Sequence, residues 1–293
     1  MMNILVRAAR DAGEAATFIA ALNSHRTNHI GFCGGEEKEI RHTLEHDFSD
    51  TGFEQSFFMA EKEGRIVGAV GFDIDSDDGI AEVWGPFVSE DLSFREVAMP
   101  MWSKALQSLN DVREFLFFVN EENTDVSAMA ESIGADHAGR HLILRAQPGI
   151  ATVGDHQAIP AEERHEKEFR SMHDRAFPGT YLSAEEILGL RDDNHRLLVI
   201  PDGETDIRGY VYTEADPIHG EGSIEFLAVG EAYRRQGLAT KLLQAGLTDL
   251  FRHDSIKEVR LTVGADNEAA LGLYEAAGFE RLHRMNAYRL ELG

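Results

Sequence analysis

The chain has 293 residues, enough for about two ordinary domains that each bury a core. Its 52 acidic and 28 basic residues give a formal net charge of -24, which argues against nucleic acid or an anionic membrane surface as the main partner. A cationic small molecule suits this charge better, although an acidic surface also serves solubility alone.

Cysteine content and apolar runs indicate the compartment. Cys33 is the single cysteine, so an internal disulfide is impossible and a reducing environment is expected. No apolar run approaches the roughly 18 to 20 residues that cross a bilayer. The N-terminal residues also lack the long apolar segment of a secretion signal. We therefore expect a cytoplasmic protein with no membrane partner.

The first half of the chain mixes predicted helices with predicted strands. Apolar residues on both sides of Glu63 and Gly64 predict a hairpin, and Asn123 is expected to begin a helix. Apolar periodicity predicts the remaining elements. They are helices over residues 11–22, 36–47 and about 97–109, and strands over residues 81–88, 114–119 and 141–146.

A domain boundary is predicted at residues 147–160, which contain two prolines, two glycines and few bulky apolar residues. We expect one domain over residues 1–148, a linker over 149–159 and a second domain over 160–293. The same order of elements then recurs, which indicates an internal repeat. Its predicted elements are helices over 162–176 and 184–191 and strands over 197–200 and 208–214.

The stretch from Ile224 to Leu247 is predicted to be a buried strand followed by a helix whose first turn contains residues 234–240. Leucines recur at helical spacing after Gly237, so one helix face can pack on a sheet and the helix N-terminus can face solvent. Unpaired N–H groups at such a start bind anions, and Gly237 and Ala239 allow a phosphate to approach the backbone. The stretch is not a P-loop, since Leu238 follows the glycine where that motif has lysine.

Residues Arg234, Gly237 and Ala239 after an apolar strand resemble the Arg/Gln-x-x-Gly-x-Gly/Ala signature of the GCN5-related N-acetyltransferase (GNAT) family. A second block of that family is similar to the next strand and helix, where Asn267, Ala270, Tyr274, Gly278 and Phe279 stand at the family's spacing. The resemblance covers roughly residues 160–293. It implies an α/β fold with a mixed sheet, and the repeat extends this to two tandem GNAT-like acyl-CoA N-acyltransferase domains.

The same resemblance implies that acetyl-CoA is the co-substrate. Backbone groups of the strand end would pair with the pantetheine arm, and the helix start with its basic residues would hold the pyrophosphate. Asn267 would either touch the pantetheine or simply cap a helix. The expected coenzyme-binding residues are Leu227, Ala228, Val229, Arg234, Arg235, Gln236, Gly237, Leu238, Ala239, Thr240 and Asn267.

Two residues are candidates for proton transfer. Tyr274 occupies the position where the family carries a general acid, and its alternative role is to pack a helix on the sheet. Glu225 is a charged residue inside an apolar strand, which suggests a general base, but it would be equally at home as a solvated strand residue. Glu214 and Glu221 are weaker alternatives for the base.

The acceptor is expected to be the primary amine of a small molecule, attacked directly in a ternary complex. Phe177 and Tyr181 lie in a loop between predicted helices, where family members build the acceptor pocket. We expect them to contact the substrate, and the alternative is that they pack under the loop. The alternatives are a protein N-terminal or lysine acetyltransferase and a non-catalytic acyl-CoA sensor. The chain is expected to be a monomer or a homodimer.

The first domain is expected to have lost catalysis. Counting forward equally from Val88 and Val229 places Glu96 opposite Gly237, so a carboxylate would repel the pyrophosphate. Setting Gly134 against Gly278 places an asparagine opposite Asn267 but an alanine opposite Tyr274.

Residues His42, Glu45 and His46 fit the zinc peptidase pattern H-x-x-E-H. No downstream helix offers an evident third ligand, so we expect these to be solvated helix residues and expect no metal.

Overall fold

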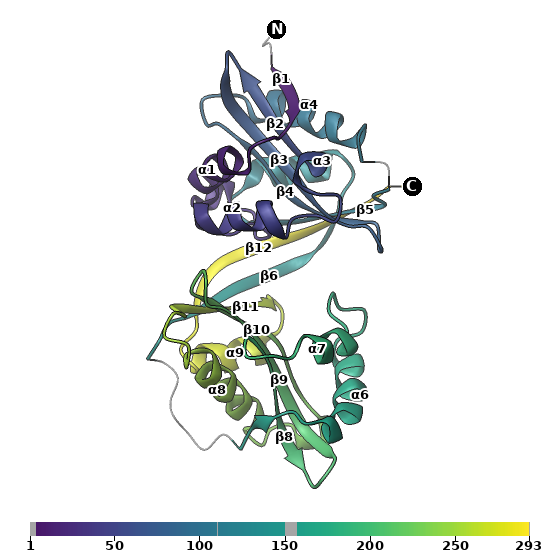
Figure 1. The fold of residues 1–293 in the computed structure, drawn as a ribbon, viewed down its shortest axis with the longest axis vertical. Coiled ribbons are helices and arrows are strands. Elements are labelled where there is room, and N and C mark those ends of the chain that lie inside the picture. The colour runs from purple at the N-terminus through teal and green to yellow at the C-terminus, as the bar shows by residue number, and fades with distance from the viewer. Residues whose placement is uncertain (1–3, 110, 150–156, 293) are drawn as a thin grey trace. The chain divides into compact units, whose positions relative to one another are not determined.

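The computed structural model describes residues 4–109, 111–149 and 157–292 (Figure 1). Its contacts divide the chain into two compact units. Unit 1 consists of residues 1–141 and 283–293, and unit 2 of residues 142–282. Among the residues described, no helix combines the length and apolar character needed to cross a membrane.

Unit 1 follows the predicted order of elements, with Asp11 capping its first helix and a left-handed turn at Glu63 and Gly64 closing the predicted hairpin. A short helix and an N-terminal strand were not predicted. The elements are β1 (Leu5–Ala8), α1 (Ala12–Asn23), η1 (Arg26–Asn28), α2 (Glu37–His46), α3 (Phe53–Ser56), β2 (Phe57–Lys62), β3 (Arg65–Asp75), β4 (Ile80–Val88), α4 (Phe94–Leu106), β5 (Glu114–Asn120), α5 (Thr124–Ser132) and β6 (Asp136–Ala146).

Unit 2 repeats this order, as predicted. Its helices α6 and α7 precede three strands, and α8 and α9 alternate with the later strands. The elements are β7 (Ile159–Pro160), η2 (Glu163–His165), α6 (Glu166–Ala176), α7 (Ala184–Leu190), β8 (His195–Asp202), β9 (Asp206–Asp216), β10 (Glu221–Val229), η3 (Glu231–Tyr233), α8 (Leu238–Leu250), β11 (Glu258–Gly264), α9 (Glu268–Ala276) and β12 (Glu280–Glu291).

The sheets are mixed, in agreement with the predicted fold class. In unit 1, β1 to β4 pair antiparallel in order and β4 pairs parallel with β5. In unit 2, β7 to β10 pair antiparallel in order and β10 pairs parallel with β11. Parallel neighbours need a helical crossover, which α4 and α8 provide.

The units differ from the predicted domain boundaries at two strands. The first part of β6 belongs to unit 1 and the part from Leu142 belongs to unit 2. Conversely, residues 283–291 of β12 belong to unit 1, where Met285–Glu291 pair antiparallel with β5. Residues 150–156 of the predicted linker lie outside the described residues. A boundary read from proline and glycine content cannot detect that the last strand pairs with β5 of unit 1.

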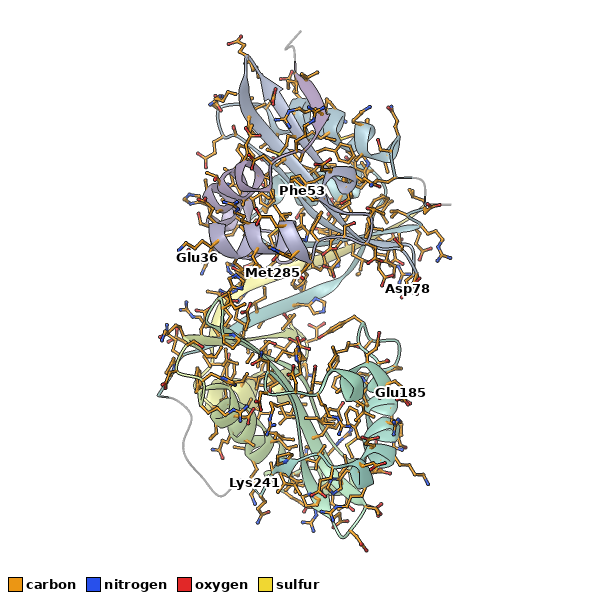
Figure 2. The ribbon with its side chains drawn as sticks, viewed as in Figure 1. Glu36, Phe53, Asp78, Glu185, Lys241 and Met285 are labelled. Atoms are coloured by element: carbon orange, nitrogen blue, oxygen red, sulfur yellow. The ribbon has the colours of Figure 1, made fainter. Side chains whose placement is uncertain are left out.

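Each unit buries its own apolar core. In unit 1 the aromatic side chains pack closely; Phe53, labelled in Figure 2, lies with its ring centroid 5.2 Å from that of Phe57. In unit 2 the sheet has a core on each face. One contains side chains of α8, such as Leu242, and the other contains side chains of α6 and α7, such as Phe169 and Ile187. The second core supports the loop between α6 and α7.

The comparison of the two halves was correct at one helix and wrong at another. Asn123 and Asn267 both cap helices, accepting hydrogen bonds from Val126 N at 3.2 Å and Ala270 N at 3.1 Å. However, Ser93 precedes α4 as Gly237 precedes α8, so Glu96 is not opposite Gly237. The connection from β10 to α8 is longer than the connection from β4 to α4. Counting the same number of residues forward from Val88 and Val229 did not allow for this difference. Glu96 nevertheless lies in the first turn of α4, where a carboxylate disfavours an anion.

Unit 1 contains a carboxyl group that is costly to ionise. Glu82 on β4 pairs with Asp73 on β3, and burial together with the Asp73 charge raises the pKa of Glu82 from 4.5 to about 7. Between these values the folded state binds more protons than the unfolded state. The contribution of Glu82 therefore lowers the free energy of unfolding as pH rises from about 4.5 to about 7.

We expect Glu82→Gln to raise the free energy of unfolding by about 1–3 kcal/mol at pH 8, because the amide removes the cost of ionisation. The gain should disappear near pH 4, where Glu82 is already neutral. Urea unfolding at both pH values measures this difference, and Glu90→Gln on an exposed loop is the matched control. An equal effect at both pH values would contradict the assignment.

Candidate active site

The connection between β10 and α8 forms one end of the candidate site. Gly237 precedes the first helical residue, Leu238, and has a φ of 75° and a ψ of 7°. Arg235, with a φ of 62°, also has left-handed backbone, a conformation that favours glycine. The prediction that Arg234, Arg235 and Gln236 lie in the first helical turn is therefore wrong. They lie in the connection, and the helix begins after Gly237.

Helix α8 presents free backbone donors at its N-terminus. Its first helical hydrogen bond is donated by Lys241 N to Gly237 O at 3.2 Å, so the N–H groups of Leu238, Ala239 and Thr240 precede the helical ladder. The Leu238 side chain is buried in the core, which leaves only its backbone for a ligand. These N–H groups and the positive end of the helix dipole can hold an anion.

Polar side chains surround this helix start. Arg234 is 64% exposed, and its guanidinium lies 3.5 Å from Val229 O and 3.8 Å from the Glu231 carboxylate. Arg235 is exposed, and Gln236 donates to a backbone carbonyl of the same connection at 3.3 Å. The two arginines add positive charge at the point where the helix offers its N–H groups.

Strand β10 loses a neighbour along its length. Its pairing with β9 continues to Val229, opposite Gly209. Its parallel pairing with β11 is found only for Glu221–Ser223 within the described part of the chain. Leu227, Ala228 and Val229 therefore lie outside the ladder with β11. Such an edge can bind an extended chain through backbone hydrogen bonds.

A cleft of about 790 Å³ lies beside this edge and extends to α9. Among the predicted residues, Leu227, Ala228, Val229, Arg234, Ala239, Asn267 and Phe177 line it. The remaining predicted residues do not: Arg235, Gln236, Gly237, Leu238, Thr240, Glu225, Tyr181 and Tyr274.

Several lining residues were missed by sequence reasoning. Most come from the end of α6, the β10–α8 connection and the first turns of α9: Met172, Arg175, Ala176, Gly230, Glu231, Ala269, Ala270 and Leu273. Met172 and Ala176 are four residues apart and therefore share one face of α6. Helical periodicity in the sequence could have predicted that they line the cleft together.

Glu225 occupies a β-bulge in β10. Ile224 pairs with Thr213 and Phe226 pairs with Tyr212, so Glu225 is the extra residue between them. The bulge also explains why Ile224 and Phe226 pack into different cores although they are two residues apart. A bulge can re-aim a side chain, and here it lifts Glu225 out of the regular ladder.

The loop between α6 and α7 brings aromatic residues to Glu225. The Tyr181 hydroxyl donates a hydrogen bond to Glu225 Oε2. The Tyr181 ring stacks on Phe226 with centroids 5.4 Å apart, and Phe177 contacts Phe226 at 5.0 Å. Because Tyr181 is 72% exposed, one face of its ring remains available to a ligand. The structure thus brings together Phe177, Tyr181 and Glu225.

A buried histidine, which the sequence did not single out, holds this loop. His173 on α6 is 1% exposed, and its Nε2 donates to Leu182 O at 3.0 Å. A carbonyl only accepts, so in the neutral imidazole Nδ1 accepts from the Tyr210 hydroxyl at 2.7 Å. The bond to Leu182 fixes the residue next to Tyr181.

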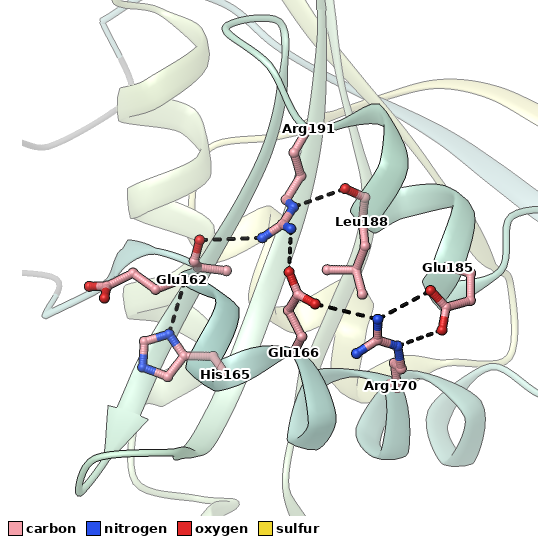
Figure 3. A network of polar contacts seen from close by, with 8 residues as sticks. Glu162, His165, Glu166, Arg170, Glu185, Leu188 and Arg191 are labelled. Atoms are coloured by element: carbon pink, nitrogen blue, oxygen red, sulfur yellow. Dashed lines mark hydrogen bonds and ion pairs between the residues drawn. The ribbon is translucent and has the colours of Figure 1, made fainter.

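Ion pairs brace the two helices that carry the loop (Figure 3). Arg170 on α6 lies 2.6 Å from Glu185 on α7 and 3.4 Å from Glu166. Arg191 after α7 pairs with the same Glu166 and donates to Leu188 O at 3.1 Å. Glu166 thus joins the start of α6 to the end of α7.

Helix α9 carries the second predicted block. Asn267 caps this helix and also lines the cleft, so its capping role is present without a ligand. Tyr274 is half-buried, with its ring 5.7 Å from that of Phe279. Burial raises the pKa of Tyr274, which keeps its hydroxyl protonated. Glu221, a weaker base candidate, is 2.9 Å from Arg260.

A helix start with free N–H groups, an unpaired strand edge and a cleft between them occur together in unit 2. Residues 161–279 match the family described as "Acetyltransferase (GNAT) family". The GNAT match thus lies within unit 2 and includes both blocks from which the resemblance was inferred.

Two relatives of the GNAT region differ in the acceptor that their names indicate. The chain is 45% identical over 69 residues to N-alpha-acetyltransferase 30 of Schizosaccharomyces pombe (strain 972 / ATCC 24843), covering 24% of this chain and 45% of that protein. It is 35% identical over 98 residues to mycothiol acetyltransferase of Kocuria rhizophila (strain ATCC 9341 / DSM 348 / NBRC 103217 / DC2201), covering 32% of each. The matches span less than half the length of these relatives.

The fold extends beyond the GNAT match. A solved structure described as "Tandem GNAT protein from the clavulanic acid biosynthesis pathway (without AcCoA)" is similar with a TM-score of 0.67 and 15% identity. The similarity covers 99% of both chains. At this identity the comparison concerns the fold, and it confirms the predicted tandem GNAT-like architecture.

Proposed function

We propose that unit 2 transfers an acetyl group from acetyl-CoA to the primary amine of a small molecule, by direct attack in a ternary complex. The observation that carries this proposal is the unpaired edge of β10 at Leu227–Val229, which leads to the helix start after Gly237. An extended pantetheine arm fits the edge, and a pyrophosphate fits the helix start.

The coenzyme-binding roles follow from these positions. The backbone of Leu227, Ala228 and Val229 would pair with the pantetheine and polarise the thioester carbonyl. The N–H groups of residues 238–240 would bind the pyrophosphate, with Arg234 and Arg235 neutralising its charge. The α9 residues Asn267, Ala270 and Leu273 line the other side of the same cleft.

Glu225 is proposed as the general base. An alkyl amine has a pKa near 10.4, so about one molecule in a thousand is the free base at pH 7, a handicap of about 4 kcal/mol. Glu225 stands two residues before the unpaired edge, and its carboxylate can remove the ammonium proton directly or through a water. Tyr274 is proposed as the general acid that protonates the leaving thiolate of coenzyme A.

Unit 1 is proposed to have no catalytic role. Glu96 lies in the first turn of α4, where a carboxylate opposes a bound phosphate, and Ala130 stands where unit 2 has Tyr274.

A protein acceptor is the second candidate, favoured by the name of the Schizosaccharomyces pombe relative. A protein N-terminus would have to enter the site beside Tyr181 as an extended peptide. A non-catalytic acyl-CoA sensor is the third candidate, and turnover of any amine would exclude it.

We expect acetyl-CoA to be consumed in the presence of at least one small amine from a panel of alkyl amines, diamines, aminoglycosides and amino acids. Release of free thiol measures the reaction, and peptides with free N-termini test the second candidate in the same assay. Exclusive turnover of peptides would replace the small-molecule proposal. Coenzyme binding without turnover of any acceptor would favour the sensor.

A further inference from the structure

Two carboxylates without a lysine or arginine partner lie on the acceptor side of unit 2. Glu214 on β9 pairs with Ser223 on β10, two residues before Glu225. Neither Glu214 nor Glu225 forms an ion pair with lysine or arginine within the described residues. Burial first, and then the Glu225 charge, raises the pKa of Glu214, while the nearby Tyr212 hydroxyl and the charge of His195 act against this rise.

A buried hydroxyl next to this pair is a second and independent observation. Tyr212 is 0% exposed and precedes Glu214 by two residues, so both side chains lie on one face of β9. Its hydroxyl is directed towards the Glu214 carboxylate, yet it reaches no partner at ordinary hydrogen-bond distance among the described residues. Buried polar atoms normally have a partner, so a ligand group is expected there.

The surroundings suit a positive charge. The Tyr181 ring stacks on Phe226 beside Glu225, and the charges that act on the Tyr212 hydroxyl are those of Glu214, Glu225 and Asp192. An ammonium group can donate to carboxylate and phenol oxygens together and can contact an aromatic face. It would also relieve the repulsion between the two glutamates.

We propose that Tyr212 and Glu214, beside Tyr181 and Glu225, bind a second ammonium group of the acceptor, so that the substrate is a diamine or a larger polyamine. This inference rests on the proposed function, since Glu225 serves the reacting nitrogen. Two residues along a strand span about 6–7 Å, so the second nitrogen lies about that far from the first. Tyr212 and Glu214 hold the second nitrogen.

The test compares diamines of increasing length, from 1,3-diaminopropane to 1,8-diaminooctane, with monoamines of the same carbon number. For wild-type protein we expect kcat/KM to favour one intermediate diamine over its monoamine by about tenfold or more, as for one charge-assisted hydrogen bond. Glu214→Gln should reduce this ratio to nearly one. Glu204→Gln, which removes a charge from an exposed turn of the same unit, should keep the ratio.

Calorimetry of the preferred diamine gives a readout that does not need turnover. Affinity that Glu214→Gln weakens about tenfold, even without any acetyl transfer, would support this subsite while refuting the proposed function. Equal kcat/KM for diamines and monoamines in the wild type, or a preference for basic peptides, would overturn the inference and leave acetyl transfer standing. If Glu214→Gln does not fold, the wild-type length series alone decides.

Discussion

Gly237→Glu is expected to weaken acetyl-CoA binding by at least about 100-fold. The new carboxylate would stand at the start of α8, a few Å from a bound pyrophosphate, and like charges 4 Å apart repel by about 4 kcal/mol at an intermediate dielectric. The same charge at a helix N-terminus favours the helix itself, so folding should suffer less than binding. Isothermal titration with acetyl-CoA measures the affinity.

Gly237→Ala is the matched control for this variant. A Cβ at this position meets no atom within 4 Å, so alanine adds only the strain of a φ of 75°. That strain is about 1–2 kcal/mol and is shared by both variants. Thermal unfolding should therefore shift similarly in the two proteins, whereas only glutamate should remove binding. Retained affinity in Gly237→Glu would refute the phosphate site at this helix start.

The coenzyme side of the site could be predicted from sequence because its determinants are local. Short stretches of sequence contain each of these determinants: the helical spacing of leucines in α8, the helix cap at Asn267 and the glycine before α8. The error at the helix start has a physical reason. Leucine spacing indicates which face of a helix is buried, but it does not indicate at which residue the helix begins. Here the left-handed backbone of Arg235 and Gly237 delays the helix start until after Gly237.

The acceptor side depends on contacts between distant segments, which the sequence does not indicate. The hydrogen bond from His173 to Leu182 and the Tyr181 contact with Glu225 depend on how the loop between α6 and α7 folds over the sheet. The bulge at Glu225 could not be predicted either, because the apolar pattern of β10 continues through it. The pairing of Met285–Glu291 with β5 likewise joins segments far apart in the chain.

Glu225 and Glu214 are proposed to have different roles in the reaction, although both are half-buried strand carboxylates. Glu225 is displaced from the ladder by the bulge and stands next to the unpaired edge of β10. Glu214 remains in the regular ladder, opposite Ser223. These positions support the proposals that Glu225 transfers the proton and that Glu214 recognises charge.

Tyr274→Phe is expected to lower turnover by about 100-fold and to leave the affinity for acetyl-CoA near that of the wild type. General acid catalysis contributes about 10²–10⁴-fold, and phenylalanine removes only the hydroxyl. The ring contact with Phe279, with centroids 5.7 Å apart, is retained, so α9 should stay packed on the sheet. Steady-state kinetics with a saturating amine and calorimetry with the coenzyme measure the two quantities.

Two features of the Tyr274 hydroxyl support the proposed role. Burial raises the pKa of Tyr274, so the phenol stays protonated through the neutral range, and it forms no hydrogen bond with another described residue. It is therefore free to donate to the departing sulfur. Tyr288→Phe, which deletes a phenol hydroxyl in unit 1, is the matched control and should leave turnover near the wild type. If Tyr274→Phe also turned over at the wild-type rate, Tyr274 would serve only to pack α9, and the thiolate would have to leave without this acid.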